Sequence, residues 1–303
     1  MVRTAALSGE GRSTAATTWV PWIVAALAYG WLFWSPLTGT ARLWWVDPDA
    51  GHGLLLAPLA LILAWRSGIA PGARARPYAG LAILALAVTF RTIGGLATEL
   101  YTMRVAAWLA VIGIVVFAAG FVQVRRWWLP AALLLLSLPL PEIVLASLAL
   151  PLQVRASELG AALLDWRHVP VHLAGNVIQL PGHALFVTEA CSGLRSLSAL
   201  LALGLLIGGL FLHTWWGRLA LVTIAIPIAM FLNGVRIFLT GFAVFYIDPK
   251  LGEGVMHYTE GWFMFVAALI VLAGAAWLIH WVEQRRAAIG QGLGGGEGQI
   301  ATA

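Results

Sequence analysis

The chain has 303 residues, of which 61% are hydrophobic and 10% are charged, and its mean hydropathy is +0.88. A soluble domain normally carries about 25% charged residues, so this composition excludes an ordinary soluble domain and indicates a polytopic membrane protein. The formal net charge is +5 and every cation except Lys250 is an arginine. In so apolar a chain such charge is typical of loops that set topology, so we expect no nucleic-acid partner.

Eight stretches are apolar enough to be candidate transmembrane helices, and they predict an all-α fold of about eight spans in a lipid bilayer. The stretches are 19–38, 51–66, 78–96, 105–122, 127–149, 194–212, 218–243 and 259–281. Pro139 and Pro141 interrupt the fifth stretch, so we expect that helix to break there.

The distribution of arginines predicts the orientation. With the N-terminus placed in the cytoplasm, the predicted inner segments hold ten arginines and three acids, and the rest of the chain holds eight cations and ten acids. Because cytoplasmic loops carry an excess of arginine and lysine, both termini are expected to be cytoplasmic. Residues 39–50, 97–104, 150–193 and 244–258 are then extracytoplasmic.

Three regions follow from these patterns: a cytoplasmic tail over 1–18, a transmembrane domain over 19–282 and a disordered glycine-rich cytoplasmic tail over 283–303. Within the domain, the extracytoplasmic segment 150–193 has structure of its own. Apolar residues at helical spacing predict an amphipathic helix lying on the membrane surface. They are Leu152, Ala156, Leu159, Leu163 and Trp166.

A small β-hairpin is expected after that helix. Two turn signals, Ala174-Gly175-Asn176 and Pro181-Gly182, separate short β-prone runs. The hairpin leads directly into the only cysteine of the chain, so it would present that residue on the outer face.

Cys191 is the first candidate for chemistry. Ser192 and Gly193 follow it, and an apolar helix is expected to begin there. A helix N-terminus offers free N–H groups and a positive dipole, and Arg195 adds a charge, so all three favour the thiolate. Glu189 could orient a base or bind Arg195. The alternative is a cysteine that only packs.

Arg236 is the second candidate. It lies about 15 Å of helix before Tyr246, and Asn233 lies one turn earlier on the same face. A charge at that depth is costly and needs a partner, so it favours a role in oxyanion stabilisation or in binding a carboxylate. The alternative is an arginine that pairs with an acid for packing.

His257 is the third candidate, at the outer start of the last span. A histidine is the usual base for a cysteine nucleophile, and Glu260 could orient its ring. The alternative is an interfacial histidine without a catalytic role. His52 begins the second span on the same side, where it could contact substrate or be purely structural. The remaining histidines lack ligand spacing, so we expect neither a metal nor a cofactor.

These residues resemble the exosortase/archaeosortase family of polytopic membrane cysteine enzymes. The resemblance runs from about residue 45 to 282 and is strongest in "GNVIQLPGHALFVTEACSGLRSLSALLALG", "IPIAMFLNGVRIFLTGF" and "HYTEGW". It implies that Cys191 is the nucleophile, Arg236 the oxyanion stabiliser and His257 the base. "AGHG" stands where the family more often has Ser-His-Gly, which weakens a role for His52.

The resemblance also implies a sorting function. Family members are thought to act at the outer face of the bacterial cytoplasmic (inner) membrane, in systems linked to exopolysaccharide. Their substrate proteins carry a C-terminal signal made of a Pro-Glu-Pro-type motif (PEP-CTERM), a transmembrane helix and a basic tail. The implied reaction is that of a thiol protease or transpeptidase acting through a thioester.

Two other classes of function remain open from the residues alone. One is a membrane acyl- or glycosyltransferase of polysaccharide assembly, which would not depend on the thiol. The other is a transporter in which Arg236 binds an anion, although we find no inverted repeat in the sequence.

Overall fold

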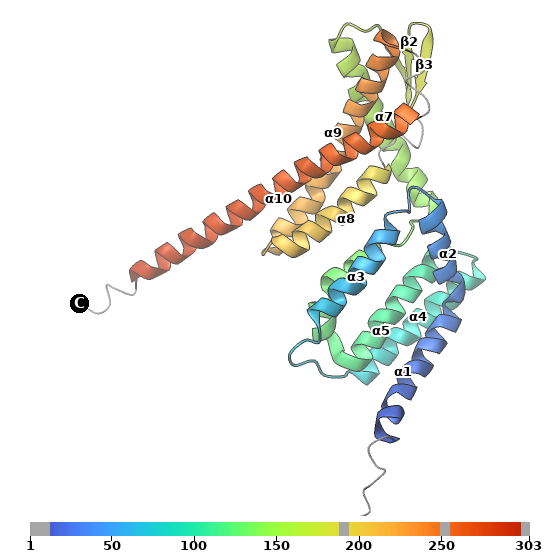
Figure 1. Ribbon diagram of the computed structural model, residues 1–303, viewed down its shortest axis with the longest axis vertical. Coiled ribbons are helices and arrows are strands. Elements are labelled where there is room, and N and C mark those ends of the chain that lie inside the picture. Colours follow the sequence, from blue (N-terminus) through green and yellow to red (C-terminus); the bar gives the residue numbers. More distant parts are fainter. Residues whose placement is uncertain (1–12, 188–193, 249–254, 298–303) are drawn as a thin grey trace, which may run out of the picture.

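The computed structural model describes residues 13–187, 194–248 and 255–297, which form ten helices and a small sheet (Figure 1). The helices are α1 Ser13–Leu32, α2 Trp34–Val46, α3 Gly53–Ser67, α4 Pro77–Leu96, α5 Leu100–Arg126, α6 Trp128–Leu136, α7 Glu142–Trp166, α8 Leu194–Phe211, α9 Trp215–Tyr246 and α10 Val255–Glu297. The strands are β1 His172–Ala174, β2 Val177–Leu180 and β3 His183–Phe186.

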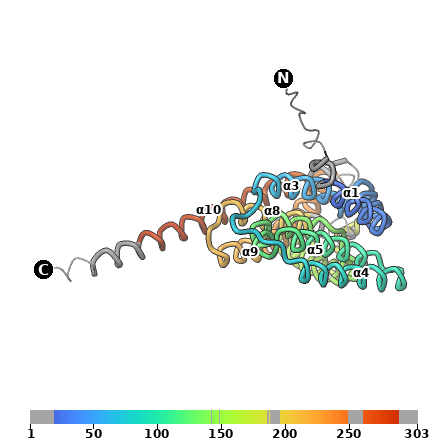
Figure 2. The backbone as a smooth tube through the Cα atoms, turned by 90° about the horizontal axis from the view of Figure 1, so that it is seen from below, coloured from blue at the N-terminus to red at the C-terminus, as the bar shows by residue number. Residues whose placement is uncertain are grey.

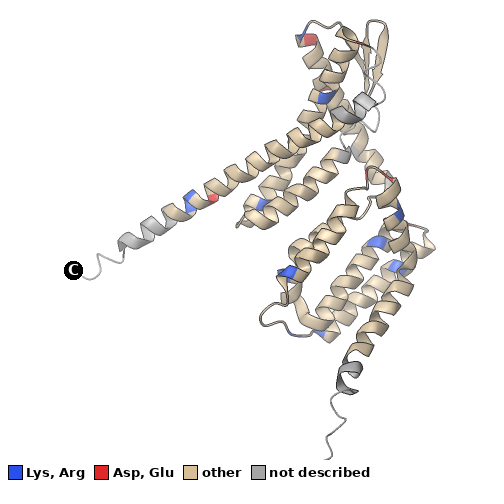
Figure 3. Ribbon diagram, in the orientation of Figure 1, with Lys and Arg blue, Asp and Glu red and all other residues tan. Residues whose placement is uncertain are grey.

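The helices are those of a multi-pass membrane protein. Among the described residues, 5 helices are long and apolar enough to cross a bilayer, or up to 6 if α1 and α2, bent by 69°, form one span. Helices α3 and α8 are apolar but shorter. Charged residues lie mostly near helix ends (Figure 3), and large apolar side chains such as Trp31 and Trp65 are exposed along the helices. Such a surface suits lipid rather than water.

The predicted break in the fifth stretch is confirmed. Helix α6 ends at Leu136, residues 137–141 form a non-helical link, and α7 begins at Glu142. Pro139 and Pro141 lack the N–H groups that a continuous helix would need. However, α7 then runs unbroken to Trp166, so the predicted boundary near 149 is wrong, while the alternative that the span ends at Pro141 and the chain turns along the surface remains open.

Helix α7 packs on α9 along its second half, because both helices carry glycine where they cross. A Cβ on Gly160 would stand 2.6 Å from Ile237, and one on Gly241 would stand 2.8 Å from Leu164. Glycines allow two backbones to approach closely, which is how membrane helices gain contact area. The amphipathic face predicted for this segment therefore meets a neighbouring helix, with Ala156 buried in the contact.

The extracytoplasmic hairpin expected from the two turn signals is a three-stranded antiparallel sheet in the order β1-β2-β3. Both turns fall where the sequence places them, and Gly175 and Gly182 adopt φ of 64° and 80°, which glycine tolerates best. Ile178 of β2 is fully buried in a cluster with residues of α7 and α9. The sheet is thus fixed to these two helices.

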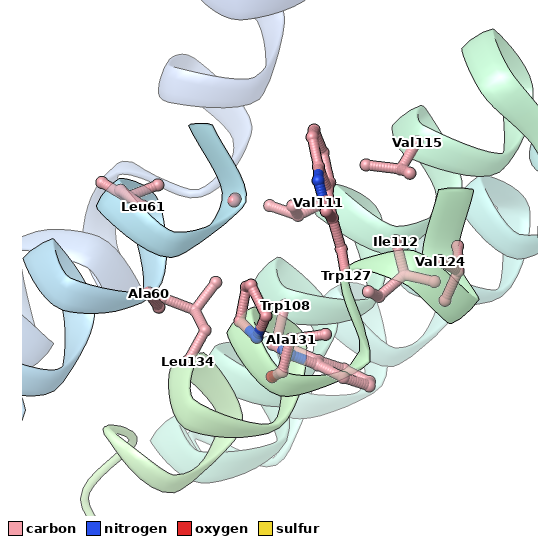
Figure 4. Close-up of a pocket in the computed structure, with 12 residues that line it drawn as sticks. Ala60, Leu61, Trp108, Val111, Ile112, Val115, Val124, Trp127, Ala131 and Leu134 are labelled. Carbon is pink, nitrogen blue, oxygen red and sulfur yellow. The ribbon is translucent and has the colours of Figure 1, made fainter. Parts of the chain in front are cut away.

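A small cavity of about 100 Å³ lies between α3, α5 and α6 (Figure 4). Its walls include Ala60, Leu61, Trp108, Trp127 and Leu134. The indole Nε1 of Trp108 donates to the carbonyl of Ala131 at 2.8 Å, so it is engaged within the bundle. The lining is apolar, so this cavity offers no group for chemistry.

Helix α10 crosses α8 and α9, and its C-terminal part projects from the other helices (Figure 2). It continues as helix through Glu297, so residues 283–297 are not the disordered tail that we predicted. The run from Glu283 to Ala288 consists of strong helix formers, which extend the apolar helix before the glycines begin.

Glu283 belongs to the folded domain, and the predicted boundary at 282 is therefore too early. Its carboxylate accepts hydrogen bonds from the N–H groups of His213 and Thr214, at 3.0 and 3.2 Å, and from the Thr214 hydroxyl. Thr214 is itself the N-cap of α9, accepting from the N–H of Gly217 at 3.0 Å. Glu283 therefore ties α10 to the turn between α8 and α9.

Replacing Glu283 with alanine is expected to lower the free energy of unfolding by about 1–2 kcal/mol. The reason is that the N–H and hydroxyl of Thr214, the N-cap of α9, lose the carboxylate that accepts their hydrogen bonds. Thermal unfolding of the purified protein in detergent would measure the change. Arg286→Ala, at an exposed position on the next turn of the helix, is the matched control and should unfold like the wild type. Equal stability of the two variants would contradict a structural role for Glu283.

Candidate functional site

The structure describes part of the predicted site. Glu189, Cys191, Ser192 and Gly193 lie outside the described residues. For three further predicted residues the structure describes the helix backbone and not the side chain. They are Arg195 on α8 and His257 and Glu260 on α10. Arg236, Asn233 and His52 are fully described.

The chain is held firmly on both sides of residues 188–193. Val187 is 1% exposed, and its N–H donates to the carbonyl of Asn176 at 3.0 Å. The side-chain amide of Asn176 returns a hydrogen bond to the carbonyl of Val187 at 3.1 Å. On the other side α8 begins at Leu194, as the sequence predicts, and buries Leu197 in the cluster shared with α9 and α10. The segment containing Cys191 thus joins two packed anchors.

Arg236 lies at the crossing of α9 and α10. A Cβ on Gly261 would stand 3.5 Å from Cζ and Nη2 of Arg236 and 3.6 Å from Nη1, so the guanidinium lies against the backbone of α10. Position 257 is one helical turn before Gly261, on the same face of α10. The helix backbones therefore bring the Arg236 guanidinium to within about one turn of the position of His257.

The face of α9 that carries Arg236 is polar for two turns. Asn233 and Thr240 are 5% and 4% exposed, and the Thr240 hydroxyl donates to the Arg236 carbonyl at 3.0 Å. Polar groups buried inside a membrane protein face other helices or a wet cavity. Asn233 and Arg236 lie one turn apart on α9, and their depth in the membrane remains a prediction.

His52 lies apart from these residues, at the start of α3. Its Nδ1 is 3.0 Å from the carbonyl of Asp49 and its Nε2 is 3.3 Å from the carbonyl of Leu136. Nearby, the indole of Trp44 donates to the carbonyl of Ser137 at 2.7 Å. The side chains of His52 and Trp44 therefore contact backbone carbonyls at the C-terminal end of α6. Carbonyls at a helix C-terminus have no N–H partner within the helix.

Sequence reasoning missed Arg104. We predicted residues 97–104 as an outer loop, but α5 begins at Leu100 and Arg104 is 5% exposed within it. Its Nη1 donates to the carbonyl of Pro139 at 3.2 Å, in the link between α6 and α7. A signal was present: Met103, Ala106, Ala107 and Ala110 are small or apolar at helical spacing, and they predict burial of this side of the helix.

Arg104 and His52 line the same cavity, of about 790 Å³. It lies where the turns α2–α3, α4–α5 and α6–α7 meet α8, and Asp47, Asp49 and Glu99 also line it. Glu99 caps α5 by accepting from the N–H groups of Tyr101 and Thr102, at 2.9 and 2.6 Å.

The carboxyl group of Glu99 is biased toward its charged form. Burial would raise its pKa, but the hydrogen bonds from Thr102 and Tyr101 outweigh that cost and lower the pKa below its ordinary value, helped by the charge of Arg104. The rim of the cavity therefore carries a carboxylate at neutral pH.

The fold and these buried polar groups define a multi-pass membrane protein with a polar crossing between α9 and α10. Residues 44–274 match the model of one family, described as Transmembrane exosortase (Exosortase_EpsH). The chain therefore belongs to the transmembrane exosortase family, a family of membrane sorting enzymes, as the motifs predict. No curated protein and no solved structure matches the chain.

Proposed function

We propose that this chain is a membrane cysteine protease or transpeptidase that removes the C-terminal sorting signal of exported proteins. The signal would consist of a Pro-Glu-Pro-type motif and a transmembrane helix. The observation that carries the proposal is the Arg236 guanidinium against Gly261, one turn from His257, in a chain of the exosortase family. Two of the three proposed catalytic residues thus share one helix crossing.

The proposed reaction begins when His257 takes the proton of the Cys191 thiol and the sulfur attacks the scissile carbonyl carbon. Negative charge then develops on the carbonyl oxygen, and the Arg236 guanidinium donates hydrogen bonds to it. The C–N bond breaks, His257 returns the proton to the leaving amine, and a thioester remains on Cys191. Water or an amine attacks the thioester and releases an acid or an amide, restoring the thiol.

The remaining site residues have supporting roles in this proposal. Ser192, Gly193 and Arg195, at the start of α8, favour the thiolate through free N–H groups and charge. Glu189 orients the base or binds Arg195, and Glu260 orients the ring of His257. Asn233 supports Arg236 from one turn earlier on α9.

The proposed location is the bacterial cytoplasmic membrane, with the site on the extracytoplasmic side and the enzyme serving exopolysaccharide-linked surface proteins. The arginine-rich turns 68–76 and 125–126 would then face the cytoplasm, in agreement with the positive-inside rule. This orientation places the sheet on the side where an exported substrate arrives.

Alkylation tests the proposal directly, because Cys191 is the only cysteine and a maleimide modifies no other thiol. Processing of a Pro-Glu-Pro-tailed substrate in isolated membranes should fall in proportion to the modified fraction of Cys191. The matched control is the double variant Cys191→Ala/Ser192→Cys, which moves the thiol by one residue and should be labelled yet inactive. Unchanged processing after complete alkylation would contradict the proposal and favour a thiol-independent transferase.

A further inference from the structure

The large cavity beside Arg104 is built to hold a ligand. Its volume of about 790 Å³ lies within the range of small-molecule and peptide sites, roughly 300–1,000 Å³. Leu100, Leu138, Ile143 and Leu201 give it apolar walls, and its polar groups come from loops and from the N-terminal parts of α5 and α8. Apolar walls with a few convergent polar groups are typical of binding sites.

Arg104 is the buried polar group whose hydrogen-bonding capacity is incompletely used. The side chain is 95% buried, since only 5% is exposed, and among the described residues its Nε meets no hydrogen-bond partner. Nη1 is engaged by Pro139, and Arg104 is the one cation among the described residues that line the cavity. A buried guanidinium gains most from an anion that can accept two parallel hydrogen bonds, as a carboxylate does.

The other polar groups select the kind of anion. The Asp47 carboxylate accepts from the N–H of Asp49 at 2.9 Å, and Glu99 caps α5. Within the described parts of the chain neither acid makes a direct ion pair with Arg104, although the charges of Glu99 and Arg104 attract each other. Among the described residues, three acids line the cavity against one arginine, and their field disfavours a doubly charged phosphate more than a singly charged carboxylate. The carbonyls of Pro139 and Pro141 are already engaged, the first by Arg104 and the second by the N–H groups that open α7, so the Nε of Arg104 is the group left to bind a ligand.

The cavity also adjoins the proposed catalytic site. Ser198 and Leu201 line it from α8, the helix that begins three residues after Cys191. Leu201 packs in one cluster with Leu232 of α9 and Phe265 of α10, which lie one turn from Arg236 and Gly261. The cavity and the α9–α10 crossing are therefore on two sides of the same packed cluster.

We propose that this cavity binds an extended segment of the substrate protein through one carboxylate side chain, which pairs with Arg104. The proposal rests on the proposed sorting function and adds a substrate-binding residue that the catalytic set does not contain. Binding there would place the adjoining peptide bond near the start of α8.

Substrate-side replacements test this without altering the enzyme. Each Glu and Asp around the cleavage site of the substrate is changed in turn to Gln or Asn, and the processing rate is measured with wild-type enzyme and with Arg104→Gln. One replacement should slow processing by the wild-type enzyme about tenfold or more. The same replacement should slow processing by the Arg104→Gln enzyme less than about twofold, because the substrate carboxylate and Arg104 act as a pair. If no acid matters, or if every effect is additive, the proposal is overturned.

Photo-crosslinking gives an independent readout. Benzoylphenylalanine at Leu100, in the wall of the cavity, should capture the substrate in cells carrying Cys191→Ala, and Arg104→Gln should reduce the yield severalfold. The matched control position is Leu61, in the apolar cavity of Figure 4, which should not capture substrate. Capture of lipid alone at Leu100 would overturn the proposal in favour of a lipid site.

The two proposals fail in distinguishable ways. If Cys191→Ala stops processing while the acid scan and the crosslinks are negative, the peptide-binding proposal is wrong and the sorting function stands. If processing continues in Cys191→Ala, the thiol mechanism is wrong, and the acid scan and the crosslinks decide the peptide-binding proposal separately.

Discussion

Replacing Cys191 with alanine is expected to leave the substrate at full length, with processing reduced by at least about a thousandfold, because the nucleophile itself is removed. The residue lies between two packed anchors, at Val187 and Leu197, and alanine is close to cysteine in size. The measurement is the size of a Pro-Glu-Pro-tailed substrate in the host cell, by immunoblot.

The control for this experiment is the amount of enzyme in the membrane, which should equal that of the wild type. Cys191→Ser adds a second comparison, since the hydroxyl is similar in size but far less nucleophilic at neutral pH, so this variant should also be inactive. Normal processing by Cys191→Ala would mean that the thiol only packs.

Replacing Arg236 with glutamine is expected to lower the processing rate about 100-fold or more, because a charged donor to the oxyanion is lost. Arg236→Lys should fall between wild type and glutamine, since it keeps the charge and loses the planar fork of donors. Pulse-chase labelling of the substrate measures these rates.

Thr240→Val is the matched control on the same face of α9. It removes a buried hydroxyl one turn from Arg236 while keeping the shape of the side chain, and processing should remain near the wild-type rate. The rate of maleimide labelling of Cys191 should be unchanged in all three variants, because an oxyanion stabiliser acts after the thiolate forms. Full activity in Arg236→Gln would exclude the assigned role.

Local sequence signals predicted much of the fold. Long apolar runs located the helices, the prolines at 139 and 141 located the break, and the glycine turns at 175 and 182 located the strands. These features depend on residues within a few positions of each other, which is why the sequence reveals them. The start of α8 is confirmed in the same way.

Features that depend on distant partners were not predicted. Glu283 was assigned to a tail because its partners, His213 and Thr214, lie 70 and 69 positions away. Arg104 was assigned to a loop because its burial depends on the carbonyl of Pro139, 35 positions along the chain. The contact of α7 with α9 depends on Gly160 of α7 and Gly241 of α9, which lie 81 positions apart. The catalytic roles of Cys191, Arg236 and His257 remain predictions.

The anchors on either side of Cys191 set a limit on where a substrate can be cut. An extended chain gains at most about 3.6 Å per residue, so the Cys191 Cα lies within ~14 Å of that of Val187 and within ~11 Å of that of Leu194. Val187 and Leu197 are both buried in clusters that hold them against the helices of the bundle. Under the proposed function, we therefore expect that the distance between a substrate's membrane helix and its scissile bond, rather than the motif alone, determines whether that bond meets the thiol.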